Sequence, residues 1–385
     1  MEFSLIFEAQ LADPTPEREH QLIHDCIEQA VAAEQAGFDR IWAVEHHALL
    51  RYAHMSAPEI FLAAVAARTS RIRIGHGVVC MPFNYNWPTR VAERAAMLDI
   101  ISHGRVDLGA GRGGSPQELS LCGVDRETSK AQVREALRII GSVWQEETFE
   151  WHGDLLTIEA PEGFPRHTVV PRPVQRPHPP LFLACTHAET VTTAAEYGVG
   201  ALAFGFGGPD NIKTQVDIYR VACSERSGAE LVSTTINEHF AALCPTVVIE
   251  DGAEAAQLGA RGQRFFGEAI FQWAQPGGPL PSEDTLGVDN IKYMRDKKAV
   301  VEAQFDRGEL GDYVNDRALA SAHYNVEHAY GTPQVAIDYV ESLEDIGVDE
   351  IMCIVQLGTI PHGVCLETIA NWGAHVIPHF RRRAA

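Results

Sequence analysis

The sequence predicts an α/β fold, and within that class a (β/α)8 TIM barrel with insertions. Short runs rich in Val, Ile, Phe and Leu alternate with longer segments of helical period, which is typical of repeated βα units around a parallel sheet. About eight such runs occur, near residues 3–9, 39–44, 71–79, 105–110, 181–185, 200–205, 239–248 and 350–356. Eight parallel strands close a barrel. Length alone would also allow two or three domains, but barrels of this size form one, so we expect a single domain over residues 1–385.

The expected helices carry start and stop signals at their ends. Thr15 precedes the first helix as a cap and Gly37 ends it, where a left-handed residue is needed. The helix after the third strand has Pro88 in its first turn and stops before Gly104. A helix that ends in glycine and leads into a strand is the pattern of βαβ units.

Two stretches interrupt this pattern. Residues 147–180 are polar and rich in proline, which predicts a long excursion before the fifth strand, and a second excursion is expected at about residues 262–330. The second stretch is either a lid over a binding site or a disordered surface insertion. The sequence leaves both alternatives open.

The charge balance excludes several classes of partner. A net charge of −21 argues against nucleic acid and against an anionic membrane surface, because both require positive charge on the protein. No signal peptide or stretch of 18 apolar residues is evident, so we expect a cytoplasmic protein. The eight cysteines form no CxxC pair, and no HExxH motif occurs, so no metal is assigned.

Two adjacent histidines follow the second expected strand. His46 and His47 would emerge at its carboxyl end, where side chains from several strands of a barrel converge on a ligand. A single histidine is more often structural than catalytic, but this position favours a chemical role. Successive side chains point in opposite directions, so one of the two is expected to be a supporting residue.

Three further segments suggest a flat, anionic ligand. Gly75 and Gly77 near the end of the third strand would let such a ligand approach the backbone closely. Arg112 lies in the glycine-rich LGAGRGG, where its guanidinium could bind a phosphate, although a surface turn explains it as well. The fifth strand is followed by a helix start with hydroxyl groups, Thr186 and Thr190, which suits an anion but is also explained by simple capping.

Taken together, these segments resemble the bacterial-luciferase-like, flavin-dependent monooxygenases. The second strand of that family resembles GFDRIWAVEHH, its third and fourth units resemble the stretch from RIRIGHGVV to LGAGRGG, and its closing unit resembles GTPQVAIDYVESLEDIGVDEI. The resemblance extends over nearly the whole chain. Its specific part is the succession of EHH, PxRxAE and GRxxLGxGRG in this order.

The resemblance implies a barrel that binds reduced FMN supplied by a separate flavin reductase. The reduced flavin would activate O₂ as a flavin hydroperoxide, which oxygenates a small organic substrate. His46 matches the family's residue for proton transfer. The family also has a non-proline cis peptide under the flavin ring, which would fall between Gly77 and Val78. Such a bond is less stable than the trans form by about 3 kcal/mol or more. The residues that the resemblance assigns to cofactor binding are His47, Gly77, Val78, Arg112, Gly113, Thr186, His187 and Thr190.

Two departures limit this reading. The reactive cysteine that luciferases carry beside the phosphate arginine is replaced by Gly111, so light emission is not implied. The helix start THAET also differs from the family's usual AES or PES.

Candidate apolar walls of the site are Phe83, Tyr85, Trp87 and Trp273, each of which ordinary packing also explains.

Two alternatives stay open at this level. One is a deazaflavin-dependent oxidoreductase on the same barrel, which would transfer hydride without O₂. The other is a non-catalytic flavin-binding relative. The substrate is not identified, and an exposed apolar face on the barrel would favour a homodimer or a heterodimer.

Overall fold

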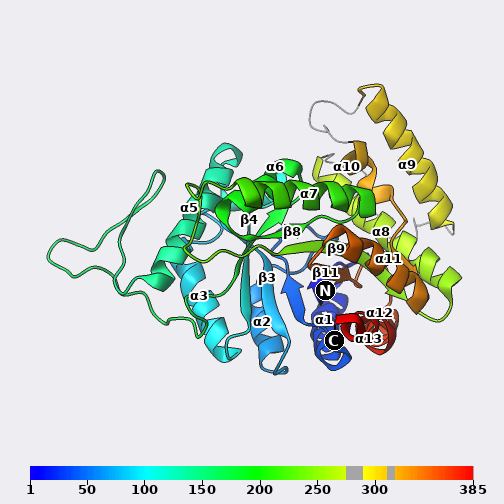
Figure 1. Ribbon diagram of the computed structural model, residues 1–385, viewed down its shortest axis with the longest axis horizontal. Helices are drawn as coiled ribbons and strands as arrows, with labels where there is room; N and C mark the ends of the chain where they lie inside the picture. The colour runs from blue at the N-terminus through cyan, green and yellow to red at the C-terminus, as the bar shows by residue number, and fades with distance from the viewer. Residues whose placement is uncertain (275–288, 310–316, 385) are drawn as a thin grey trace.

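The computed structural model describes residues 1–274, 289–309 and 317–384. Eight parallel strands hydrogen-bond in a closed ring, and this confirms the predicted (β/α)8 barrel (Figure 1). In order around the barrel they are β1 (Glu2–Phe7), β2 (Arg40–Ala43), β3 (Arg73–Cys80), β4 (Val106–Gly111), β7 (Leu181–Cys185), β8 (Gly200–Ala203), β9 (Phe240–Val248) and β11 (Glu350–Ile354).

Helices surround the barrel on its outer side (Figure 1). They are α1 (Pro16–Ala36), α2 (Pro58–Ala66), α3 (Pro88–Ile101), α4 (Pro116–Cys122), α5 (Arg126–Gln145), α6 (Ala188–Tyr197), α7 (Pro209–Glu225), α8 (Gly252–Ala274), α9 (Asn290–Asp306), α10 (Arg317–Ser321), α11 (Pro333–Ile346), α12 (His362–Asn371) and α13 (Ile377–Ala384). Outside the ring, β5 (Trp151–His152) pairs with β6 (Thr157–Ile158), and β10 (Ala329–Gly331) pairs with β9. Short 3₁₀ and π turns occupy Ala322–Tyr324 and Trp372–Val376.

The helix boundaries follow the expected capping signals. The Thr15 hydroxyl accepts a hydrogen bond from the Arg18 amide at 3.3 Å, and α1 ends at Gly37 with a left-handed φ of 91°. Helix α3 begins at Pro88, and Gly104 takes a left-handed φ of 83° in the turn before β4. Both helices therefore begin and end where the sequence predicted.

A network of buried charges lies at the amino end of the barrel. Arg40, the first residue of β2, donates to Asp107 of β4 at 2.7 Å and to Glu2 of β1 at 3.1 Å, and it also pairs with Glu350 of β11. His239, just before β9, bonds Glu350 at 2.8 Å. Burial raises the pKa of the Glu350 carboxyl, but the charge of Arg40 and the bond to His239 outweigh it and hold that pKa at about 2. Several strands are thus joined through one guanidinium.

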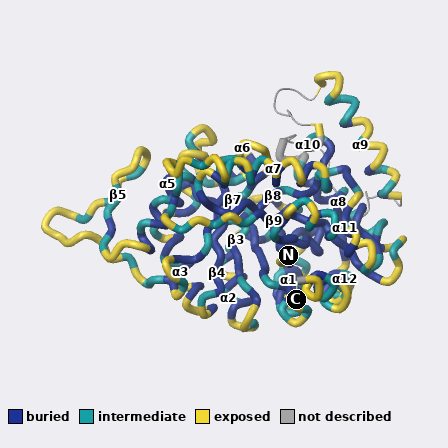
Figure 2. Tube along the Cα trace, viewed as in Figure 1, coloured by how far each residue is buried: buried dark blue, intermediate teal, exposed yellow. Residues whose placement is uncertain are grey.

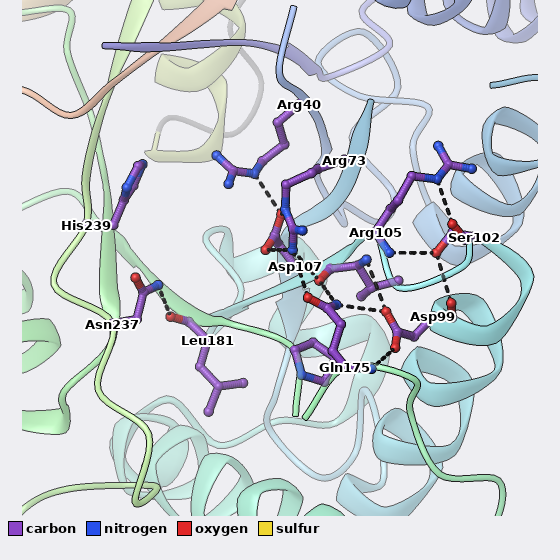
Figure 3. Close-up of polar contacts among 12 residues, drawn as sticks. Arg40, Arg73, Asp99, Ser102, Arg105, Asp107, Gln175, Leu181, Asn237 and His239 are labelled. Atoms are coloured by element: carbon purple, nitrogen blue, oxygen red, sulfur yellow. Dashed lines mark hydrogen bonds and ion pairs between the residues drawn. The ribbon is translucent and has the colours of Figure 1, made fainter. Parts of the chain in front are cut away.

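The same network extends to the segment 147–180, which we call the arm (Figure 3). Asp107 also accepts hydrogen bonds from Arg73 at 2.6 and 2.8 Å, and Arg73 donates to the Gln175 side chain at 3.2 Å. Gln175 donates in turn to Asp99 at 2.8 Å, which also accepts from the Val174 amide at 2.7 Å. The carboxyl end of the arm is therefore tied to the barrel.

The excursions take different forms. The arm projects from the barrel and carries the β5–β6 hairpin, as expected for an insertion, and much of it is exposed (Figures 1 and 2). Residues 262–274, where we expected irregular chain, instead continue α8, because Phe266, Ala269 and their neighbours repeat at helical spacing and pack into the core. Residues 275–288 and 310–316 of this excursion, on which the alternatives of a lid and a disordered insertion depend, lie outside the described residues.

Gly75 of β3 has a different role from the one expected. A Cβ on Gly75 would lie 2.2 Å from the Trp42 ring, and one on Gly77 would lie 3.0 Å from Trp42 Cβ. The missing side chains therefore make room for a tryptophan inside the barrel, rather than for a flat ligand at Gly75. The expected cis peptide between Gly77 and Val78 is also wrong, because cis bonds within the described ranges precede only Pro171 and Pro177. The strand accommodates this stretch by a register shift against β4 between His76 and Val79.

None of the helices within residues 1–274, 289–309 and 317–384 is long and apolar enough to cross a membrane. This agrees with the absence of a long apolar stretch in the sequence.

Replacing Arg40 by Met should lower the free energy of unfolding by about 3–5 kcal/mol, because the buried carboxylates of Asp107 and Glu350 would lose the guanidinium that they share. Urea unfolding measures this difference. The matched control is Lys213→Met, which removes an exposed ion pair with Asp217 and should cost less than about 1 kcal/mol. Equal effects of the two variants would show that the network does not stabilise the barrel.

Candidate active site

The residues selected from the sequence lie at one end of the barrel. In a parallel barrel the carboxyl ends of all strands share one mouth. The histidine pair directly follows β2, Arg112 follows β4, and Thr186 follows β7. The structure therefore brings segments distant in sequence to the same mouth. They are residues 46–47, 77–78, 112–113 and 186–190.

His46 lies between two carboxylates. Its Nδ1 is 2.8 Å from Oε1 of Glu118 in α4, and its Nε2 is 3.8 Å from Oε2 of Glu8, which directly follows β1. The Tyr52 ring packs edge-on against the imidazole at 5.2 Å between centroids, and its hydroxyl bonds Glu8. Each of these groups is mostly buried. The arrangement is a compact acid–base cluster at the mouth.

The pKa values in this cluster move in opposite directions. Burial raises the pKa of Glu8 to about 6, against the opposing charge of His46 and the Tyr52 bond. Burial also raises the pKa of Glu118, but hydrogen bonds from His46 and Ser115 outweigh it and hold that pKa at about 2. Burial lowers the pKa of His46, but the bond to Glu118 and the charge of Glu8 reverse this and the net change is upward.

These values define which nitrogen of His46 can exchange a proton. An ionised Glu118 only accepts hydrogen bonds, so the Nδ1 of His46 carries the hydrogen in their contact. Glu118 is itself fixed by the Ser115 amide and hydroxyl, each at 2.8 Å. The Nε2, on the Glu8 side, is therefore the position through which a proton can enter or leave the ring.

His47 is held as a supporting residue. Its Nε2 is 3.0 Å from Glu45, and the hydrogen bond to Glu45 raises the pKa of His47. The Glu45 carboxylate also accepts from the Cys80 amide at 2.7 Å and from the Asn86 side chain at 2.9 and 3.1 Å. The opposite face of the His47 ring stacks on Tyr85 at 5.6 Å. The two histidines thus have different surroundings, as the alternation of side chains predicted.

Arg112 lies in a basic environment without a carboxylate bonded to it. Among the described residues, its guanidinium has no hydrogen bond or ion pair. Burial lowers the pKa of Arg112, and the charge of Arg126 lowers it further, while Glu189 opposes both. A half-buried guanidinium repelled by a second one favours an anion as ligand.

The start of α6 lies near Arg112. The charge of Glu189, in the first turn of this helix, acts on the pKa of Arg112. The Thr190 hydroxyl accepts from the His187 amide at 3.2 Å and donates to the His187 carbonyl at 2.8 Å. The Glu189 carboxylate is bonded at 2.7 Å to Lys130 of α5. The N-cap of α6 is therefore His187, with Thr190 in its first turn, and Thr186 lies one residue before the cap rather than acting as it.

Val78 and Gly113 have clear packing roles. A Cβ on Gly111 would lie 2.4 Å from the Val78 side chain, so glycine in β4 makes room for this valine. Gly113 has a left-handed φ of 82°, and a Cβ there would lie 2.8 Å from the Tyr85 hydroxyl oxygen. Of the other wall candidates, Trp87 is 43% exposed before α3, and the side chain of Trp273 lies outside the described residues.

Sequence reasoning missed Glu8, Tyr52 and Glu118. Glu118 could have been found, because Ser115 to Glu118 reads SPQE, a capping-box pattern, and the structure contains that box. Glu8 had a weaker signal, a carboxylate directly after an apolar strand. Nothing in the pattern of the sequence distinguishes Tyr52.

Known proteins share the fold and the family of this chain. A family model described as luciferase-like monooxygenase matches residues 1–350. The chain therefore belongs to the luciferase-like monooxygenase family, and the resemblance seen in the sequence is confirmed.

Relatives within the family differ in chemistry. The oxygenase component of a flavin-dependent trigonelline monooxygenase from Acinetobacter baylyi is 24% identical over 366 residues, covering 93% of this chain and 90% of that protein. An F420-dependent glucose-6-phosphate dehydrogenase from Amycolatopsis mediterranei is 34% identical over 135 residues, covering 34% of this chain and 40% of the relative.

Solved structures share the fold over the full length. Monooxygenase RslO1 from Streptomyces bottropensis has a TM-score of 0.73 at 25% identity and covers 99% of this chain and 100% of its own. The oxygenating constituent of 3,6-diketocamphane monooxygenase from Pseudomonas putida has a TM-score of 0.70 at 19% identity, with 98% of each chain covered.

Replacing Glu8 by Gln should change how stability depends on pH. The folded pKa of about 6 exceeds the unfolded value of 4.5, so the stability that Glu8 contributes is present below pH 4.5 and lost as pH rises through 6. As the pH rises from 4.5 to above 6, the free energy of unfolding of the variant should therefore increase relative to that of the wild type by on the order of 1–2 kcal/mol. Urea unfolding across this range measures the difference.

The matched control is Glu118→Gln, for which the sign is reversed. The folded pKa of Glu118 lies below 4.5, so its contribution is present above pH 4.5 and lost as pH falls toward 2. This variant should be less stable than the wild type at neutral pH. If the free energy of unfolding of the Glu8 variant equals that of the wild type at every pH, the raised pKa of Glu8 is contradicted.

Proposed function

We propose that this protein is an FMN-dependent monooxygenase that uses reduced FMN and O₂ to oxygenate a small organic substrate. The observation that carries the proposal is the presence, at one barrel mouth, of Arg112, which has no ion-pair partner among the described residues, and of the acid–base cluster of His46. The first suits the phosphate of a cofactor, and the second suits proton transfer beside its reactive ring. Membership of a family of monooxygenases supports this reading.

The residues present fit a phosphorylated flavin. Arg112 and Arg126 supply positive charge in a chain whose net charge is −21, and the start of α6 adds backbone amides nearby. We assign the phosphate to this group of residues and the ring to the β3 side, at Gly77 and Val78. Bound reduced flavin would supply the electrons that activate O₂.

His46 would hold and move a proton in this reaction. The bond to Glu118 fixes the orientation of the ring, and Nε2 is left to exchange a proton with a ligand or with Glu8. Because Glu8 has a pKa of about 6, it can take or return a proton near neutral pH. His47 is proposed to border the cofactor while its own ring stays held by Glu45.

A separate flavin reductase is the proposed source of reduced FMN. The relative from Acinetobacter baylyi is named as the oxygenase component of its system. Oxygenation should therefore proceed with chemically reduced FMN, with no nicotinamide cofactor added.

We also propose a homodimer through the outer face of α2 and α3. A groove of about 350 Å³ lies there, lined by Met97, Ile101 and Val170 together with both signs of charge. Ile60 beside it is 70% exposed. A second copy could cover such apolar surface and match its mixed charges, and the molecular mass in solution tests this.

The competing function is a deazaflavin-dependent oxidoreductase. It is favoured by the 34% identity to an F420-dependent enzyme over 135 residues. The two functions differ in one measurable quantity, because hydride transfer consumes no oxygen. An oxygen electrode during turnover therefore separates them.

Replacing Arg112 by Ala should weaken the binding of FMN by about 1.5–3 kcal/mol, the scale of a lost charge-assisted contact. Anaerobic fluorescence titration measures the Kd. The control is Arg381→Ala, which removes an exposed guanidinium bonded to Asp39 at the amino end of the barrel. An unchanged Kd for the Arg112 variant would remove the phosphate assignment.

Replacing His46 by Ala should leave the Kd of reduced FMN nearly unchanged while it lowers oxygenation by about 10² or more, as expected for a lost acid–base group. Product formation from photoreduced FMN and a panel of ketones, aldehydes and arenes measures this. Full activity of the variant would clear His46 of the role.

A further inference from the structure

One buried polar group at the mouth is left without a partner. The Tyr85 hydroxyl is inaccessible to solvent, and within the described part of the chain it has no hydrogen-bond partner. A buried hydroxyl without a hydrogen bond is destabilising by comparison with a satisfied one, so an unsatisfied group at a ligand site points to a ligand.

The position of this hydroxyl is fixed on several sides. The Tyr85 ring stacks on His47 with planes 24° apart. The next residue, Asn86, bonds Glu45 and the Cys80 carbonyl, the latter at 3.0 Å. On the other side, the Phe83 amide donates to Gln132 of α5 at 2.8 Å. The loop therefore cannot easily turn the phenol toward water.

The hydroxyl lies against the backbone of the proposed cofactor site. A Cβ on Gly113 would be 2.8 Å from its oxygen, and Gly113 directly follows Arg112. The only residue type that avoids this contact is glycine, which also suits the φ of 82° there. The phenol thus lies against the residue that follows Arg112, to which we assign the flavin phosphate.

We propose that Tyr85 donates a hydrogen bond to an oxygen or nitrogen acceptor of bound flavin, next to the contact made by Arg112. This inference rests on the proposed function, because it adds a residue to the same site. It makes the β3–α3 loop part of the cofactor site, which the sequence had suggested only as an apolar wall.

The chemistry of the group agrees with a donor role. Burial raises the pKa of Tyr85, so the phenol keeps its hydrogen throughout the physiological range. A flavin offers ring carbonyls, ribityl hydroxyls and phosphate oxygens, all of which accept hydrogen bonds. A neutral donor also adds specificity beside Arg112 without adding charge.

The test is Tyr85→Phe, which removes the hydroxyl and keeps the ring stacked on His47. The Kd for reduced FMN, measured by anaerobic titration, should rise about fivefold to tenfold. The melting temperature of the variant without flavin should be unchanged or higher, because no hydrogen bond is lost in the free protein. The variant should thus bind FMN more weakly without losing thermal stability, a combination that the loss of a purely structural tyrosine would not give.

Tyr219→Phe is the matched control. The Tyr219 hydroxyl donates to the Val199 carbonyl at 2.8 Å, so this variant should have a lower melting temperature and an unchanged Kd for reduced FMN. An unchanged Kd for Tyr85→Phe, or a lower melting temperature without flavin, would overturn the inference. If the wild type binds no reduced FMN, the proposed function fails as well, whereas wild-type binding with an unchanged variant refutes the Tyr85 contact alone.

Discussion

The buried guanidinium of Arg40 holds together four strands of the barrel at its amino end. Its partners come from β1, β4 and β11, while Arg40 itself opens β2. Burying these charges is unfavourable unless all are paired, and removing one leaves the others uncompensated. The network therefore fixes these four strands relative to one another at the end of the barrel opposite the mouth.

The two ends of the barrel differ in how fully their buried polar groups are hydrogen-bonded. At the amino end, Asp107 and Glu350 each accept several hydrogen bonds. At the mouth, the Tyr85 hydroxyl and one Glu8 oxygen have no hydrogen bond among the described residues. Evolved proteins depart from full pairing mainly where function requires it. Buried side-chain atoms without a partner among the described residues also occur elsewhere, on Gln29 of α1 and Gln215 of α7. The contrast between the two ends therefore supports a ligand site at the mouth but does not locate it alone.

Much of the fold could be predicted from the sequence, because strand runs and helix caps are local signals. Thr15, Gly37 and Pro88 work in the structure as their residue types require. Gly75 of β3 could not be assigned correctly, since the Trp42 ring that fills the space beside it comes from another strand. The partners of His46 were missed for the same reason, as Glu8 and Glu118 lie 38 and 72 positions away in the chain. Local patterns mark where a strand ends but not what gathers there.

The opposed pKa values around His46 give the mouth a direction for proton transfer. Glu118, with a pKa of about 2, stays ionised and acts only as an anchor for Nδ1. Glu8, with a pKa of about 6, changes charge near neutrality and faces Nε2. In the proposed reaction, a proton that reaches His46 from a ligand would therefore exchange with Glu8 rather than with Glu118, whose carboxyl is too acidic to hold it. Such a one-sided arrangement suits a reaction that must deliver and recover a proton at a single point. The proposed arrangement would serve either flavin or deazaflavin, so it does not by itself distinguish the two proposed cofactors.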